Sequence, residues 1–229
     1  MVVRDRLGAA YVEFLVVIGP FLVLVLGLTQ LGLLFGADLL VAHAAGKAAR
    51  AAIVILPDDH EDADYGGVPV NQVGLGGEGL GAYMLAPSGG RLAAIRDAAR
   101  LTLSPIGPSL DSVNPGSVAG ALIQPSGVSL LSGLIGWTAL AVAVSFPDGE
   151  GGFRTTFDPR GPVTVRVTYL FRCAVPLGRD LLCGGIGSLS PDQAGALLQN
   201  GGALHGIVTL AGWRVFALEA ERTLPNQGR

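Results

Sequence analysis

The chain has 229 residues, which fits one ordinary domain or a smaller domain joined to an attachment segment. Half of the residues are hydrophobic and only 14% are charged, which argues against a disordered chain and a highly charged coiled coil. A net charge of −3 offers no basic surface for nucleic-acid phosphates, so we expect no nucleic-acid partner. The 35 glycines and 14 prolines favour strands and loops over an all-helical bundle.

The first predicted element is a long apolar helix. Residues 14–37 carry no charged side chain. As a helix this run would extend about 36 Å, enough to cross a hydrocarbon core about 30 Å thick. Arg4 and Arg6 precede the run and an acidic stretch at 58–64 follows it, so the positive-inside rule predicts a cytoplasmic N-terminus and an exported remainder. A removable secretory signal fits less well, because its apolar core would be much shorter.

A carboxylate stands where this apolar run opens. Glu13 costs free energy in a membrane unless it is paired or reaches the hydrated interface. At the interface it would be hydrated and would have no further role. It lies five positions beyond Gly8, which follows a short charged leader. The arrangement Gly8-Ala9 followed by Glu13-Phe14 resembles the cleavage site of class III prepilins. In this respect the chain resembles the TadE-like minor pilins of the tight-adherence (Tad, or Flp) pilus system.

The resemblance implies that a membrane-embedded aspartic peptidase cuts between Gly8 and Ala9. The new amine at Ala9 would be mostly protonated, and Glu13 would lie four residues further on the same helical face. The carboxylate could then pair with this amine or with the amine of a neighbouring subunit. Phe14 departs from the tyrosine usual in major Flp pilins and is closer to the Glu-Phe pair common in TadE-like proteins.

The likeness is strengthened by Pro20, by the run 28–35 and by the alanine-rich stretch 38–55. Pro20 should bend or locally open the helix, because it lacks a backbone N–H. Gly32 and Gly36 form a small-xxx-small pair that permits close helix packing, as a filament would require. Glycine is also frequent in any membrane helix of this composition, so both interpretations of the pair stay open.

The resemblance also implies the organisation and the partners of the protein. We expect a leader at 1–8, a transmembrane and extended helix at 9–56 and an exported domain at 57–229. The protein would lie in the bacterial inner membrane, with its C-terminal domain periplasmic or extracellular, or be incorporated in a pilus. Its expected partners are the major Flp pilin, other minor pilins, the prepilin peptidase and the pilus platform proteins with their ATPase.

The exported portion is predicted to be α+β. Apolar residues at helical spacing predict a short amphipathic helix over 91–103, with Arg96 and Arg100 facing away from its apolar side. The apolar run 137–146 and the alternating run 163–169 predict two antiparallel strands joined by a long hairpin, with 153–157 as a short extension.

The last elements complete this fold class. A capping box at Ser190-Pro191-Asp192-Gln193 predicts another short helix that ends at Gly201. Residues 213–222 predict a final strand, with Val215, Ala217 and Leu218 facing inward. We therefore expect an antiparallel sheet of about three to four strands with short flanking helices.

Two cysteines lie close together after the best strand. In an exported domain Cys173 and Cys183 favour a disulfide, which would stabilise the fold by roughly 3 kcal/mol through loop closure. A metal or redox role has less support, because the spacing is not Cys-x-x-Cys. The turn at 175–177 and the closing stretch 220–224 also look like the C-terminal part of TadE-like proteins, so the resemblance covers about half of the chain.

The remaining motifs give weak signals. The Gly74-x-Gly76-x-x-Gly79 pattern arises easily in a glycine-rich tract, and the acidic run 58–64 lacks the EF-hand spacing for calcium. His43, His60 and His205 are far apart in sequence, so no zinc site is predicted.

No common catalytic motif occurs in the sequence, and we expect no enzyme and no cofactor. Residues 58–136 show no likeness to the family. A permanently anchored ligand-binding domain without a pilus role and a membrane-tethered hydrolase are the alternatives.

Overall fold

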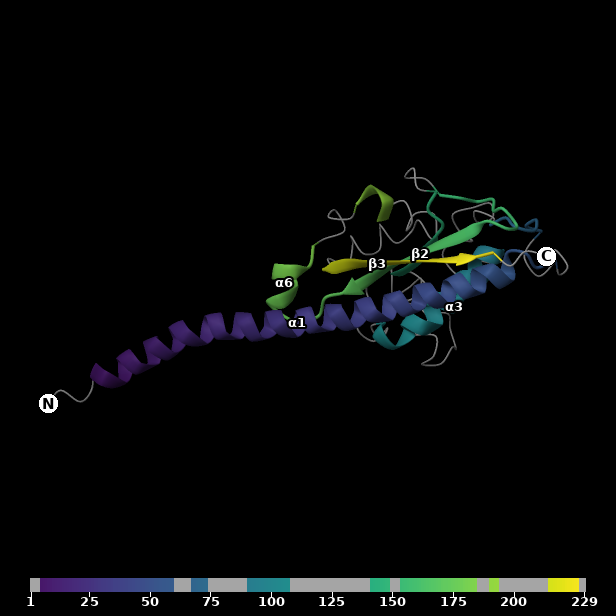
Figure 1. The fold of residues 1–229 in the computed structure, drawn as a ribbon. Coiled ribbons are helices and arrows are strands. Elements are labelled where there is room, and N and C mark those ends of the chain that lie inside the picture. Colours follow the sequence, from purple (N-terminus) through teal and green to yellow (C-terminus); the bar gives the residue numbers. More distant parts are fainter. Residues whose placement is uncertain are drawn as a thin grey trace, which may run out of the picture.

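A computed structural model describes the backbone of residues 5–59, 67–73, 90–107, 141–148, 153–184, 190–193 and 214–226, with side chains from residue 11 onward. One helix dominates it (Figure 1). Helix α1 (Asp5–Ile55) has 51 residues and is about 77 Å long at 1.5 Å per residue. It remains helical through Pro20 and ends at Ile55, one residue before the predicted end at residue 56. Its N-terminal half projects away from the rest of the chain, and its C-terminal half packs along the domain.

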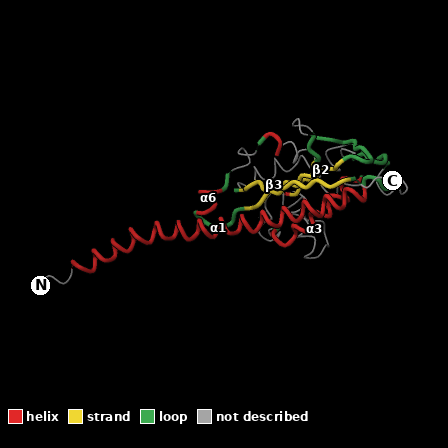
Figure 2. Tube along the Cα trace, in the orientation of Figure 1, coloured by secondary structure: helices red, strands yellow, loops and turns green. Residues whose placement is uncertain are grey.

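The domain contains a three-stranded antiparallel sheet in the order β1-β2-β3 (Figure 2). Strand β1 (Val142–Ser145) pairs with β2 (Pro162–Arg172), which pairs along its whole length with β3 (Val215–Pro225). The structure therefore confirms the predicted antiparallel pairing of the first two strands and the predicted α+β fold class. The last strand begins close to the predicted start and runs three residues further.

Helix α1 covers one face of this sheet together with α3 (Arg91–Leu103), whose bounds are those predicted. The residues that α1 buries recur every three to four positions, as an amphipathic helix requires. They are mostly alanines, whose small side chains let the helix axis approach the strands closely. The buried set on α1 is Gln30, Leu34, Ala37, Val41, Ala44, Ala45, Ala48, Ala49 and Ala52.

The prediction for the polar side of α3 was wrong at Arg96. This side chain is only 4% exposed, and burial, with a smaller contribution from nearby Arg100, lowers its pKa to about 10. The physical reason is that α3 packs against both α1 and β1, so more than one stripe of the helix is covered. Arg91, at the start of α3, is also fully buried and donates to the backbone carbonyl of Ile55. Arg100 remains partly exposed and pairs with Asp97 at 2.7 Å.

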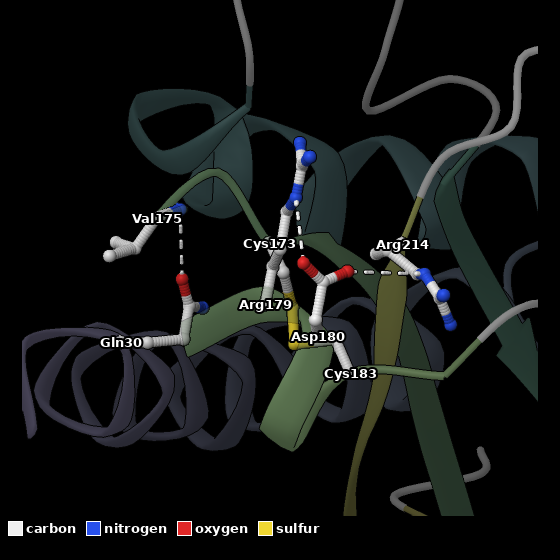
Figure 3. The surroundings of a disulfide bond; sticks show 7 residues. All are labelled: Gln30, Cys173, Val175, Arg179, Asp180, Cys183 and Arg214. Atoms are coloured by element: carbon white, nitrogen blue, oxygen red, sulfur yellow. Dashed lines mark hydrogen bonds and ion pairs between the residues drawn. A yellow bond between two sulfur atoms is a disulfide. The ribbon is translucent and has the colours of Figure 1, made fainter. Parts of the chain in front are cut away.

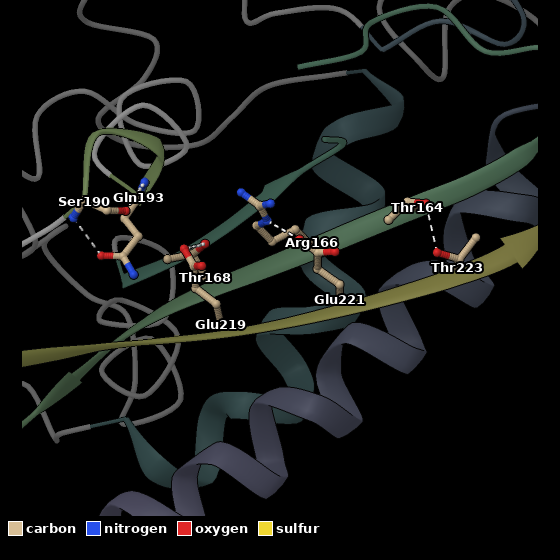
Figure 4. A network of polar contacts seen from close by, with 8 residues as sticks. All are labelled: Thr164, Arg166, Thr168, Ser190, Gln193, Glu219, Glu221 and Thr223. Carbon is tan, nitrogen blue, oxygen red and sulfur yellow. Dashed lines mark hydrogen bonds and ion pairs between the residues drawn. The ribbon is translucent and has the colours of Figure 1, made fainter. Parts of the chain in front are cut away.

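The opposite face of the sheet carries a ladder of polar cross-strand pairs (Figure 4). Arg166 Nε lies 2.6 Å from Glu221 Oε1, between a Thr164–Thr223 hydroxyl pair at 2.9 Å and a Thr168–Glu219 hydrogen bond at 3.2 Å. Such pairs contribute up to about 1 kcal/mol each and specify the register. The alternation of apolar and polar residues that predicted β2 thus has a structural reason: one face of the sheet packs against helices, and the other carries the polar pairs.

The capping box also forms as predicted. Gln193 Oε1 accepts from the Ser190 N–H at 3.0 Å, and Ser190 Oγ accepts from the Gln193 N–H at 3.3 Å. The predicted end of this helix at Gly201 lies outside the described residues, as does Trp213.

The hairpin between β1 and β2 contains the predicted extension at 153–157. Isolated bridges join Phe153 to Pro147 and Thr156 to Gln72, so the expected extension at 153–157 consists of two single bridges rather than a strand. The turn before β2 closes with Gly161 N–H donating to the Asp158 carbonyl at 3.2 Å. Phe146 and Phe157 pack edge to face beside it, with ring centroids 4.8 Å apart.

Candidate functional site

The projecting half of α1 exposes large apolar side chains along its length. The exposed fraction is 70% for Tyr11, 68% for Val16 and 58% for Leu24. A continuous apolar surface of this size is not stable in water, so it requires lipid or protein around it. Helix α1 is long and apolar enough to span a membrane once.

The residues predicted for processing and assembly lie at the start of this helix. Gly8 and Ala9 fall within α1, so the helix is continuous from the predicted cleavage point to Glu13. Positions four apart on a helix lie on one face, about 5–6 Å apart between Cβ atoms. Glu13 and Phe14 are both exposed.

The glycine pair predicted for helix packing faces open space. A Cβ built on Gly32 or on Gly36 would meet no atom of the described chain within 4 Å. The pair therefore has no packing role within the described part of this chain, and the surface that it forms is accessible to another molecule.

The predicted disulfide between Cys173 and Cys183 is confirmed, with a Cα–Cα separation of 6.5 Å (Figure 3). It closes residues 173–183, here called the disulfide loop, which contains the short helix α6 (Gly178–Leu182). This loop lies at the end of the domain nearest the projecting half of α1 (Figure 1). Its position makes it the part of the described domain that would lie closest to the membrane.

The disulfide loop docks directly on α1. Gly178 approaches so closely that a Cβ there would lie 2.8 Å from the carbonyl oxygen of Leu26 and 2.9 Å from Cβ of Gln30. The Val175 N–H donates to Gln30 Oε1 at 3.2 Å, and Gln30 is fully buried (Figure 3). The disulfide loop therefore contacts one face of the apolar run at Leu26 and Gln30. Side chains nearer the N-terminus, such as Val16 and Leu24, are exposed.

Charged side chains gather beside the disulfide loop. Asp180 lies 3.8 Å from Arg179 and 3.7 Å from Arg214, with all three side chains about half exposed. The pKa of Arg172 is lowered from its usual value, by partial burial and then by the proximity of Arg179. Among the described residues, this end of the domain therefore holds three guanidinium groups and one carboxylate.

A second feature is a groove between α1 and the edge strand β3, with a volume of about 310 Å³. His43, Lys47 and Arg50 line it from α1, and Arg222 lines it from β3. The lining residues within the described part of the chain include no acidic side chain. The described lining of the groove is therefore basic.

Three comparisons bear on the identity of the chain. Residues 8–50 match the family model of TadE-like proteins. The match begins at the glycine of the proposed cleavage site and ends within the part of α1 that packs on the sheet. It confirms the resemblance to TadE-like proteins over this helix. No curated protein and no solved structure matches the chain.

The other sequence signals receive no structural support. His43 is exposed on α1, whereas His60, His205, the glycine-rich pattern and most of the acidic run lie outside the described residues. No group of three or more potential metal ligands occurs in the part of the chain that the structure describes.

Sequence reasoning missed the docking of the disulfide loop on α1. The available signal was Gln30, an amide within an otherwise apolar run, which needs a hydrogen-bonding partner if it is not hydrated. Gly178 gave no signal, because a glycine between two cysteines is equally consistent with an ordinary turn.

Proposed function

We propose that this TadE-like protein is a minor pilin or pseudopilin that takes part in assembling a Tad/Flp-type pilus. A prepilin peptidase would remove its leader after Gly8, leaving Ala9 as the mature N-terminus. The observation that carries the proposal is the family match that starts at Gly8, on a continuous helix that presents Glu13 one turn beyond Ala9. The protein would enter the inner membrane with its N-terminus cytoplasmic and its domain outside.

The interaction between the new amine and Glu13 gives a physical reason for the position of this carboxylate. A free amine at a helix N-terminus is unfavourable because the helix dipole is positive there, and a carboxylate four residues on offsets it. In a filament the same carboxylate can neutralise the amine of the adjacent subunit, which lets both charges leave water as a pair. Exposed Gly32 and Gly36 would allow the neighbouring helix to approach closely.

Cleavage is the direct test of this proposal. Coexpression with the cognate prepilin peptidase should remove residues 1–8 and give a mature chain that begins at Ala9, as measured by intact mass and N-terminal sequencing. Gly8→Leu should block the cut, whereas Gly19→Leu, which alters another exposed glycine of α1, should leave it unchanged. A mature protein from its native envelope that retains residues 1–8 would refute the proposal.

Replacing the carboxylate tests its role in assembly. Glu13→Ala and Glu13→Gln should both abolish pilus formation, because neither can neutralise the amine, while the exported domain keeps its fold and its disulfide. Pilus number by electron microscopy and protease resistance of the domain are the two measurements. Normal piliation with either variant would contradict the assigned role.

A permanently anchored ligand-binding domain is the second candidate, and the basic groove beside β3 is the observation that favours it. In that case the leader would stay attached and Glu13 would be replaceable without consequence. The cleavage experiment separates the two functions.

A further inference from the structure

The disulfide loop carries exposed leucines at the membrane-proximal end of the domain. Leu181 is 64% exposed, Leu177 is 47% exposed and Leu182 is 37% exposed. Three large apolar side chains on an eleven-residue loop are unusual when the loop has already buried Gly178 and both cysteines. The fold of the domain does not account for their exposure.

The backbone at Leu177 adds to this observation. Its φ of +62° lies in the region that favours glycine, and the Gly178 N–H donates to the Pro176 carbonyl at 2.7 Å, which closes a γ-turn of the strained type. A leucine here costs more than a glycine would. The position therefore presents an apolar side chain to the outside at a cost to stability.

The level of the loop along α1 identifies its surroundings. From Phe14 to Gln30 the helix extends about 25 Å, slightly less than a hydrocarbon core of about 30 Å. With Glu13 at one interface, the loop that docks at Leu26 and Gln30 would lie at the other. A span that is somewhat short draws its flanking elements into the interface.

We propose that the disulfide loop is an interfacial membrane contact, in which Leu177, Leu181 and Leu182 enter the leaflet and the neighbouring arginines bind anionic headgroups. Its apolar surface lies at the same level of α1 as Leu28, which is 61% exposed and would itself face lipid. The excess of guanidinium groups over carboxylates at this end suits phosphate-bearing lipids. The domain would thus be held at a fixed height on the bilayer rather than tethered by α1 alone. The proposal requires α1 to span the membrane but does not require pilus assembly.

Quenching by brominated lipids tests this contact. The full chain is reconstituted in nanodiscs whose acyl chains carry bromine near the interface, and Leu181→Trp and Leu182→Trp are compared with the parent chain, which has two tryptophans of its own. The emission added by either new tryptophan should be shifted to shorter wavelength and lose most of its intensity in brominated discs. Val54→Trp is the matched control, because Val54 is 68% exposed but lies about 36 Å beyond Gln30 along the helix, and its added emission should not be quenched.

Two further measurements make the outcome decisive. Phe21→Trp, in the middle of the exposed apolar half of α1, should be strongly quenched, and its failure would remove the membrane span on which the proposal rests. If Phe21→Trp is quenched but both loop variants, with the disulfide intact by mass, behave like Val54→Trp, the loop is not a membrane contact and its leucines face a protein partner instead. Stronger quenching in anionic than in neutral discs is expected, and equal quenching would overturn the role given to the arginines. These discs contain no pilus components, so the result is independent of the cleavage and piliation tests.

Discussion

Gly178→Ala is expected to lift the disulfide loop off α1. The added Cβ would lie 2.8 Å from the backbone oxygen of Leu26, and neither helix can relieve a clash with backbone by rotating a side chain. Overpacking of this kind costs about 1–3 kcal/mol. The hydrogen bond from Val175 to Gln30 should be lost with the contact, leaving a buried amide partly hydrated. We expect faster amide exchange at Arg179 and Cys183, whose N–H groups are bonded within the loop, measured by hydrogen exchange in detergent micelles.

The same substitution at Gly46 is the matched control. Gly46 lies in the C-terminal half of α1, which packs along the domain, and a Cβ there would meet nothing within 4 Å. Alanine in a helix interior is favoured over glycine by about 0.5–1 kcal/mol, so Gly46→Ala should leave the loop unchanged and slightly stabilise the protein. If Gly178→Ala and Gly46→Ala gave the same exchange rates in the loop, the docking contact described here would be wrong.

The contrast between these two glycines shows how far the sequence can predict this protein. Local signals were sufficient for α3, for the capping box at Ser190 and for the antiparallel pairing of β2, because each depends on residues close together in the chain. The proposed cleavage site also rests on a contiguous motif, from Gly8 to Glu13, and stays a prediction. By contrast, the sequence gives Gly46 and Gly178 the same appearance, and only the fold shows that one meets a backbone atom.

The arginines of α3 also show a limit of prediction from the sequence. Their spacing predicted that they face solvent, which holds only for a helix that packs against a single neighbouring element. Arg96 is buried because α1 and β1 contact the helix from different directions. Long-range packing of this kind is not encoded in the period of a single helix, and burial of an arginine stem is compatible with a charged head that finds polar partners.

Removing the disulfide should lower the stability of the exported domain by about 3 kcal/mol, the loop-closure value for a link of this length. Cys173→Ala combined with Cys183→Ala is the appropriate variant, because both sulfurs are buried and serine hydroxyls would add a desolvation cost. The loss should appear as a lower denaturant midpoint in pulse proteolysis of the micelle-bound protein. Reduction of the unmodified chain should give a similar midpoint, which controls for packing defects from the alanines. An unchanged midpoint in both cases would show that the loop is held without its covalent link.

The combination of the two perturbations carries more information than either alone. The Cys173 N–H donates to the Arg214 carbonyl, so Cys173 joins the disulfide loop to the adjoining ends of β2 and β3. Once the disulfide is absent, the loop can leave α1 without unfolding these strand ends. Gly178→Ala should then cost less in the cysteine-free chain than in the disulfide-bonded chain, by a margin that a double-mutant cycle would resolve. Additive losses would instead mean that docking on α1 and closure of the loop are independent. A coupling would show that the covalent link and the fit of Gly178 together fix the domain on its helix, at the level where the leucines of the disulfide loop are proposed to meet the bilayer.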